Sequence, residues 1–197
     1  RVGTPQLLRS LTRDPGIPDP GRVPPSGIFL ETLIHDFDTL RYLNPGAEPV
    51  EVYAVTDALA YPDFKDQGLQ DTAVVLVRFG NGAMATAEAS FNAVYGYDIR
   101  GEVFGSAGMV TAGDIRRTTA TLHGADGVAS DTWRRNIDLF HDAYAAELAA
   151  FVDCARTGGA PDPTGGDARA ALAIALAAIR SAATGHPVPL GEVEQPA

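Results

Sequence analysis

Hydrophobic residues recur along this chain with two different periods. Between residues 50 and 122 they alternate with polar residues, most clearly in residues 72–79. A period of two is typical of strands that bury one face. The dipeptide Asn81-Gly82 separates this run from residues 83–91 and predicts a tight hairpin turn with positive φ at both of its positions.

Three other segments have a helical pattern: residues 28–43, 138–157 and 167–184. Apolar side chains in the second segment fall at helical spacing, so we expect it to bury one stripe. With a short strand at residues 7–12, the order of elements is strand, helix, a run of antiparallel strands and two helices. This order predicts one α+β domain over residues 1–197, an open and mostly antiparallel sheet with helices on one face.

The second face of the predicted sheet is unusually apolar for a surface that meets water. Val74, Leu76, Met84 and Phe104 alternate along their strands with polar residues. Scattered apolar residues on a surface are ordinary. A row of them on one sheet face favours a subunit interface instead. We therefore predict a homo-oligomer that assembles through this face.

Composition and charge exclude several functional classes. The chain has 15 Lys plus Arg against 25 Asp plus Glu, a net charge of −10, which argues against nucleic-acid binding. Its longest apolar run, residues 170–179, is shorter than the roughly 18 residues that span a bilayer, so we expect no membrane partner. One cysteine, Cys154, excludes a disulfide framework. The N-terminal residues lack the pattern of a signal peptide, which predicts a cytoplasmic location.

Four polar residues of the first predicted helix form one stripe. Glu31, His35, Asp38 and Tyr42 are spaced so that they stack along the same side, next to a broad apolar arc. A carboxylate one turn from an imidazole raises its pKa and holds one tautomer, so the stripe could act as a general acid/base. Two alternatives stay open: a solvated polar face, and a metal site on Glu31 and His35 that would need a third ligand.

The chain contains no common nucleotide-binding or hydrolase motif. A phosphate-binding G-x-x-x-x-G-K-[ST], a zinc-binding H-E-x-x-H and a nucleophile elbow G-x-S-x-G are all absent. Residues 101–108, G-E-V-F-G-S-A-G, have the wrong spacing for a dinucleotide-binding G-x-G-x-x-G turn and precede a predicted strand. We therefore expect no NAD binding by this chain alone.

Nearly the whole chain resembles the C-terminal domain of the glucose-fructose oxidoreductase/inositol dehydrogenase family, nearest its inositol 2-dehydrogenases. The most specific parts are the helix containing His35-Asp36-Phe37-Asp38 and the tyrosine pair of residues 93–98; other matching segments are residues 27–34, 49–55, 71–75, 102–106 and 143–147. The resemblance implies the fold of that domain, an open sheet like those of dihydrodipicolinate reductase and glyceraldehyde-3-phosphate dehydrogenase.

In that family an N-terminal Rossmann domain holds NAD or NADP, and the second domain supplies the substrate pocket and much of the oligomer interface. The resemblance thus implies the substrate-binding and oligomerisation domain of an NAD(P)-dependent dehydrogenase of polyols or sugars, inactive alone. The dinucleotide fingerprint and the family's Glu-Lys-Pro segment, which carries a catalytic lysine, are absent, and the first residue is Arg1. Both features indicate an upstream cofactor domain that is not in this chain.

The resemblance also implies roles for individual residues. His35 would exchange a proton with the reacting hydroxyl, next to Glu31, where the family has an aspartate. The extra methylene of Glu31 could change which polyol fits. The implied substrate-pocket residues are Asp14, Asp38, Tyr95, Tyr97 and Tyr144, and no metal is expected. A non-catalytic sugar-binding or dimerisation module of the same fold is the alternative, but the intact stripe favours the enzyme.

Overall fold

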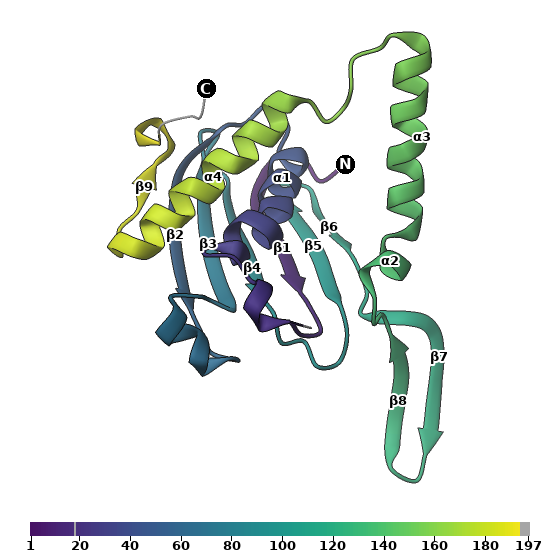
Figure 1. Ribbon diagram of the computed structural model, residues 1–197. Helices are drawn as coiled ribbons and strands as arrows, with labels where there is room; N and C mark the ends of the chain where they lie inside the picture. The colour runs from purple at the N-terminus through teal and green to yellow at the C-terminus, as the bar shows by residue number, and fades with distance from the viewer. Residues whose placement is uncertain (18, 194–197) are drawn as a thin grey trace.

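The computed structural model describes residues 1–17 and 19–193 and is built around a seven-stranded open sheet (Figure 1). The strands lie in the order β6-β5-β1-β4-β3-β2-β9. Their bounds are β1 Pro5–Arg13, β2 Pro49–Asp57, β3 Thr72–Phe79, β4 Met84–Ser90, β5 Asp98–Gly105, β6 Gly108–Ala112 and β9 Val188–Pro189. All neighbours pair antiparallel except β1 and β4, which run parallel. The expected mostly antiparallel open sheet is confirmed.

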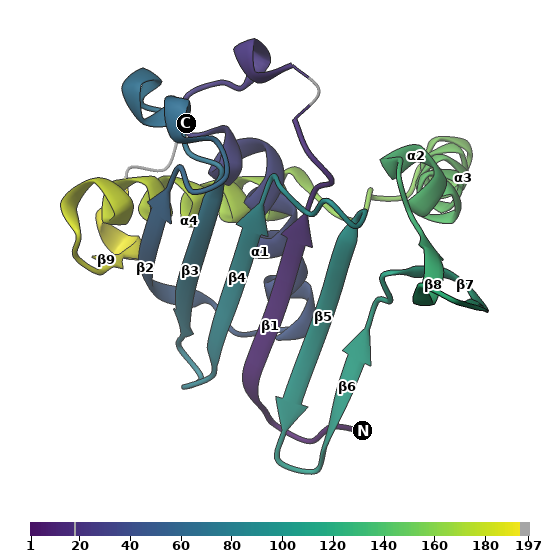
Figure 2. The same ribbon diagram turned by 90° about the horizontal axis from the view of Figure 1, so that it is seen from below.

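Two helices cover one face of this sheet and leave the other face bare. A π-helical turn, η2 (Ile28–Thr32), leads into α1 (Leu33–Leu43), and α4 (Gly165–Thr184) lies beside it. Figure 2 shows the sheet from the side that no helix covers. Short 3-10 turns complete the chain around the sheet: η1 Pro20–Arg22, η3 Pro62–Gln67 and η4 Leu190–Glu192. The expected α+β class with helices on one face is therefore confirmed.

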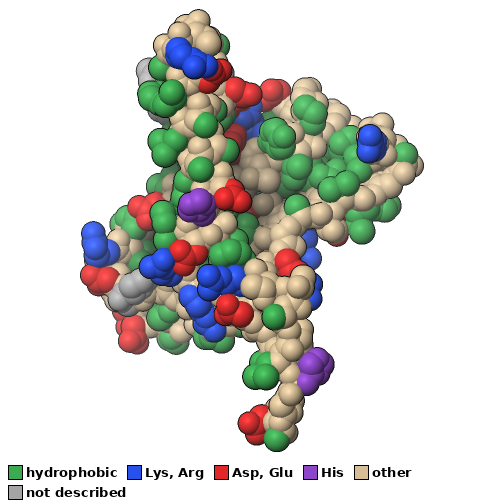
Figure 3. Space-filling model, turned by 90° about the vertical axis from the view of Figure 1, so that its right-hand side faces the viewer, with side chains coloured by type: hydrophobic (Ala, Val, Ile, Leu, Met, Phe, Trp, Pro, Cys, Tyr) green, Lys and Arg blue, Asp and Glu red, His purple; other side chains and the backbone are tan. Residues whose placement is uncertain are grey.

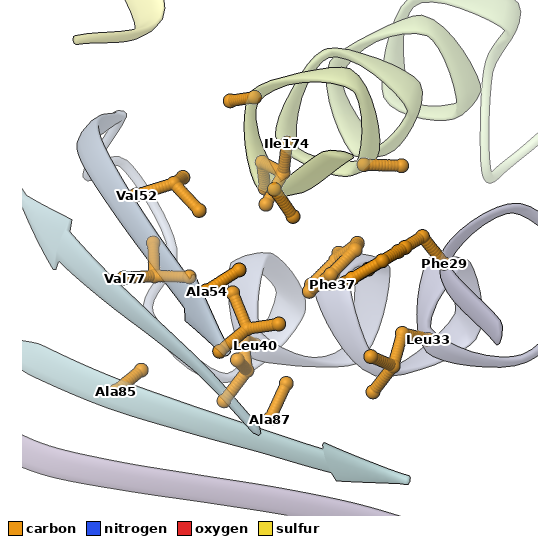
Figure 4. Packing of buried hydrophobic residues seen from close by; sticks show 14 of the residues in the cluster. Phe29, Leu33, Phe37, Leu40, Val52, Ala54, Val77, Ala85, Ala87 and Ile174 are labelled. Carbon is orange, nitrogen blue, oxygen red and sulfur yellow. The ribbon is translucent and has the colours of Figure 1, made fainter. Parts of the chain in front are cut away.

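The core fills the space between the two helices and the sheet (Figure 4). Phe29, Leu33, Phe37 and Leu40 of η2 and α1 are all at most 2% exposed. They pack with small side chains of the strands and with Ile174 of α4; the strand residues are Val52, Ala54, Val77, Ala85 and Ala87. Alanine at these sheet positions leaves room for the aromatic rings, which fixes the position of α1 over the sheet.

The hairpin turn between β3 and β4 differs from its prediction. Gly82 has a φ of 90°, but Asn81 does not have a positive φ. The Gly82 N–H bonds the Phe79 carbonyl at 2.9 Å, and the Asn81 amide donates to Asn44 Oδ1 at 3.0 Å, just beyond α1. A turn with a single left-handed residue suffices here. The expectation of two positive φ values was wrong because the loop is longer than a two-residue turn: the Gly82 N–H closes a turn on the Phe79 carbonyl, and the Phe79 N–H bonds the Ala83 carbonyl at 2.9 Å.

Beyond β6 the chain leaves the sheet as an arm, which we define as residues 116–157. The arm contains the hairpin β7 (Arg116–Gly124) and β8 (Gly127–Thr132), then α2 (Asn136–Leu139) and α3 (His141–Thr157). No residue of the arm is buried. Leu148, Phe151 and Val152 of α3 are 61–68% exposed, and Figure 3 shows hydrophobic side chains along this helix.

The prediction that this helix buries one stripe is thus wrong for the described chain, because α3 stands clear of the sheet. None of the helices in residues 1–17 and 19–193 combines the length and the apolar character needed to cross a membrane.

Candidate functional site

A cavity of about 970 Å³ lies on the helix-covered side of the sheet, at the edge that faces the arm. Its walls come from β1, β5 and β6, from η2 and α1, and from α2 and α3. The polar side chains that line it from β1, the residue after β1, η2 and α1 are Ser10, Thr12, Asp14, Glu31, Thr32, His35, Asp36, Thr39 and Tyr42. Three of the four residues of the predicted polar stripe, Glu31, His35 and Tyr42, thus line this cavity.

Five of the seven residues predicted for the site line this cavity: Asp14, Glu31, His35, Tyr97 and Tyr144. Glu31 and His35 are exposed and lie one turn apart on the helix. Asp14 directly follows β1, Tyr97 directly precedes β5, and Tyr144 lies in the first turn of α3. The tertiary structure thus brings together residues from four separate elements.

Asp38 does not line the cavity. At 100° per residue it lies about 60° from His35 on the helix, on the side away from Asp36. Its carboxylate pairs with Arg41 at 3.5 Å, and Arg41 also pairs with Asp167 at the start of α4 at 3.4 Å. Asp38 therefore faces the junction between α1 and α4 rather than the cavity.

Tyr95 also lies outside the main cavity. Its hydroxyl donates to Asp98 at 2.7 Å, next to a smaller hollow of about 370 Å³. Asp98 is 1% exposed and also accepts hydrogen bonds from Arg100 at 2.6 Å and from Arg13 at 3.3 Å. Burial raises the pKa of Asp98, but the bonds from Arg100 and Tyr95 outweigh it and hold the pKa below its usual range. Tyr95 thus anchors the loop that carries Tyr97.

That loop is also fastened to the base of the arm. The Tyr97 N–H donates to the Trp133 carbonyl at 2.8 Å, and Arg134 donates to the Val94 carbonyl at 2.9 Å. Gly96 between them has a φ of 125°, and an added Cβ would lie 2.6 Å from the Trp133 carbonyl oxygen. Only glycine fits such a close approach. These contacts fix Tyr97 relative to the segment that leads to Tyr144.

Asp36 is a cavity residue that sequence reasoning missed. It is 2% exposed, its Oδ1 accepts a hydrogen bond from Ser10 Oγ at 2.5 Å, and its Oδ2 has no hydrogen-bond partner in the described structure. Burial raises the pKa of Asp36 from its ordinary 3.8 to about 6, and the charge of Asp14 adds to this effect. A usable signal was the sequence of β1, where Ser10 and Thr12 follow the buried Leu8 at the helix-facing positions of the strand.

The electrostatics of the cavity are acidic. Burial also raises the pKa of Asp14 from 3.8 to about 6. The pKa of Tyr97 is raised by burial and then by the charges of Asp14 and Tyr144, which places these groups near one another. No group of three or more His, Cys, Asp or Glu side chains among the described residues could hold a metal ion. The metal alternative for Glu31 and His35 therefore has no third ligand in that part of the chain.

The fold is thus an open, mostly antiparallel sheet with a cavity between its helices and the arm. Residues 21–190 match the model of the oxidoreductase family, C-terminal alpha/beta domain, and the chain belongs to this family. The family identified from the sequence is thereby confirmed.

Several relatives carry dehydrogenase names. The myo-inositol 2-dehydrogenase of Thermotoga maritima is 38% identical over 194 residues, which are 98% of this chain and 58% of that protein. The scyllo-inositol 2-dehydrogenase (NAD(+)) of Bacillus subtilis is 37% identical over 190 residues, 96% of this chain and 55% of that protein. A myo-inositol dehydrogenase from Corynebacterium glutamicum has a crystal structure that superposes with a TM-score of 0.88 at 33% identity, covering 100% of this chain and 58% of that one. The chain thus spans slightly more than half the length of these relatives.

Proposed function

We propose that this chain is the substrate-binding domain of an NAD(P)-dependent oxidoreductase that oxidises a CH–OH group of a polyol or sugar. The observation that carries the proposal is the cavity itself, which places an exposed imidazole, His35, among carboxyl and phenol groups of four elements. The names of the relatives support the same reaction class.

His35 is the proposed base. A hydride leaves a carbinol carbon readily only as the hydroxyl proton departs, so a base must lie within hydrogen-bond reach of that oxygen. An imidazole titrates near neutral pH and suits this task. Glu31, one turn away, would stabilise the protonated ring. Asp14, Tyr97 and Tyr144 would bind the remaining hydroxyls and orient the reacting carbon.

The cavity also fits a nicotinamide cofactor that is held mainly by another domain. Its volume of about 970 Å³ is near the upper end of the range of about 300–1,000 Å³ that is usual for small-molecule pockets, which leaves room for a polyol and a nicotinamide ring. Bound nicotinamide supplies the hydride acceptor. The apolar side chains of Ile99, Val103 and Val110 on one wall would exclude water from that region.

The uncovered helix of the arm supports the presence of such a domain in the longer protein. An amphipathic helix of 17 residues gains most of its stability from packing of its apolar side. In α3 that side is exposed, while Tyr144 and Glu147 of the same helix line the cavity. We propose that the cofactor domain packs on α3 and thereby closes the cavity.

The bare face of the sheet is the proposed oligomer interface. Register places Met109, Phe104, Leu7 and Met84 in one continuous row across β6, β5, β1 and β4. These four residues are 42–56% exposed. A row of this kind marks a contact surface. Sedimentation of the chain at high micromolar concentration should show a homo-oligomer, and a Leu7→Glu variant should shift it toward monomer.

Steady-state kinetics on the protein produced from its complete reading frame test the function. The wild type should reduce NAD⁺ or NADP⁺ with an inositol or a related polyol as substrate. His35→Ala should lower kcat by roughly 10²–10⁴-fold, the usual size of a general acid/base contribution. His123→Ala, on the exposed hairpin, is the matched control and should leave kcat unchanged. Absence of dehydrogenase activity, or a near wild-type kcat for His35→Ala, would overturn the proposal.

A further inference from the structure

Asp36 is a buried carboxyl group for which the proposed reaction has no use. It lines the cavity at 2% exposure, and the Ser10 hydroxyl donates a hydrogen bond to its Oδ1. Its second oxygen, Oδ2, has no partner in the described structure. A buried carboxylate oxygen without a donor costs free energy. A ligand donor at this wall of the cavity would remove that cost.

Asp14 and Asp36 line the same cavity, and the charge of Asp14 helps to raise the pKa of Asp36. Asp36 lies on α1, and Asp14, directly after β1, continues the alternation of Ser10 and Thr12, so both carboxyls are on the helix-covered side of the sheet. Two like charges in a partly desolvated site disfavour each other. A positive charge bound between them would relieve this repulsion.

Of the cations near this pair, Arg13 does not line the cavity, and Arg100, which does, is bonded to Asp98. Arg13 and Arg100 both bind Asp98, and Arg13 also binds Glu88 at 3.2 Å. Within the described chain, the other titratable groups that line the cavity are Glu31 and His35 of η2 and α1, Tyr42 of α1, Tyr97 and Glu102 of the β5 segment, and Tyr144 and Glu147 of α3. Apart from His35 none of these can carry a positive charge.

We propose that Asp14 and Asp36 form a subsite for a protonated amino group, so that the preferred substrate is an amino-polyol rather than a neutral polyol. This inference rests on the proposed function, whose substrate class it narrows. An ammonium group offers three donors and a positive charge, and its hydrogen bonds to carboxylates are stronger than those of a hydroxyl. An anionic polyol, such as a phosphate ester, would be repelled by the same pair.

Calorimetry with the protein from its complete reading frame tests the subsite directly. The probes are scyllo-inositol, its amino-deoxy analogue 1-amino-1-deoxy-scyllo-inositol, and an inositol monophosphate, at about pH 7.5. The amine should bind about tenfold more tightly than the neutral polyol, since a charge-assisted hydrogen bond replaces a neutral one. The phosphate should bind most weakly.

Two variants locate the preference. Asp36→Asn removes the charge and keeps an acceptor for the Ser10 hydroxyl. Asp14→Asn removes the charge of the second carboxyl. In both, the ratio of amine to neutral affinity should fall toward one. Asp126→Asn, in the exposed turn between β7 and β8, changes the net charge equally and should leave the ratio unchanged.

Acidity gives a further readout. Near pH 5 both carboxyls of the wild type are largely protonated while the amine keeps its charge, so the preference should shrink there. Equal affinity of the wild type for amine and neutral polyol would overturn the inference, and so would an undiminished ratio in both variants. Binding of neither probe would overturn it as well. Because binding is measured without turnover, a lack of dehydrogenase activity would refute the proposed function alone.

Discussion

The helices α3, in the arm, and α4, on the sheet, have similar sequence patterns but opposite surroundings. Both α3 and α4 are rich in alanine and carry apolar side chains at helical spacing. α4 buries Ala171, Ile174, Ala175 and Ala178, whereas α3 buries no residue. The comparison shows that an amphipathic pattern specifies which side of a helix seeks a partner, while the partner itself is specified elsewhere in the protein.

The sharpest way to test this comparison is to remove one aromatic ring from each region. Phe37 of α1 is 0% exposed and Phe151 of α3 is 68% exposed. Phe37→Ala should lower the free energy of unfolding by about 3–5 kcal/mol, because it leaves a cavity in the core. Chemical denaturation of both variants measures the effect. Phe151→Ala in the same chain should change stability by less than about 0.5 kcal/mol, and equal losses would show that the arm packs against the domain in solution.

A second prediction concerns pH. The pKa of Asp36 is about 6 in the folded chain and 3.8 ordinarily, so the folded state holds the proton more tightly. The stability contributed by this group is therefore lost as pH rises from about 4 to about 6. Relative to the wild type, the free energy of unfolding of Asp36→Asn should rise over that pH window, by up to about 3 kcal/mol above pH 6. Urea midpoints measured from pH 4 to 8 provide the test, and a difference that does not vary with pH would contradict it.

The N-terminal ends of α4 and α3 differ in side-chain capping, and we expect a smaller effect on stability there. α4 begins with a capping box, in which the Thr164 hydroxyl accepts from the Asp167 N–H at 3.3 Å and the Asp167 carboxylate accepts from the Thr164 N–H at 2.9 Å. α3 has no side-chain cap at its N-terminus. Thr164→Ala should therefore cost about 1 kcal/mol, which denaturation can resolve. Thr157→Ala at the exposed end of α3 is the matched control, and an equal cost for both would argue against the cap.

The smallest effect is expected in local dynamics of the arm. Amides of α3 should exchange with deuterium faster than those of α4, because burial protects the latter. Hydrogen exchange followed by mass spectrometry compares the two helices in one sample. In a protein that also carries the proposed cofactor domain, packing of that domain should slow exchange in α3 and leave α4 unchanged. Equal protection of the two helices in the isolated chain would refute the contrast.

Much of the fold followed from the sequence alone. The two periods located the strands and the helices, because a strand with one buried face and a helix with one buried side repeat at different intervals. The same periods placed Glu31 and His35 one turn apart on an exposed side of the first helix. They also placed Val74, Leu76, Met84 and Phe104 on the bare face of the sheet, where the structure leaves all four exposed.

The sequence could not decide which polar residues of the first helix face the cavity. Asp38 belongs to the same predicted stripe as His35 but faces Arg41 and α4, whereas Asp36 lies on the side that packs against Ser10 of β1. That assignment depends on the angle at which α1 crosses the sheet. The angle is set by the packing of Phe29 and Phe37 over small strand residues.

Other features also depended on contacts between distant segments. The parallel pairing of β1 with β4 joins residues 7–13 to residues 84–90, and no local pattern specifies it. The longer loop between β3 and β4 needs a positive φ at Gly82 and not at Asn81. The arm remained uncovered because its apolar side has no partner among the described residues. Local periodicity therefore determined the elements of this protein, and only tertiary packing decided their neighbours, because burial depends on what lies opposite a side chain as well as on the side chain itself.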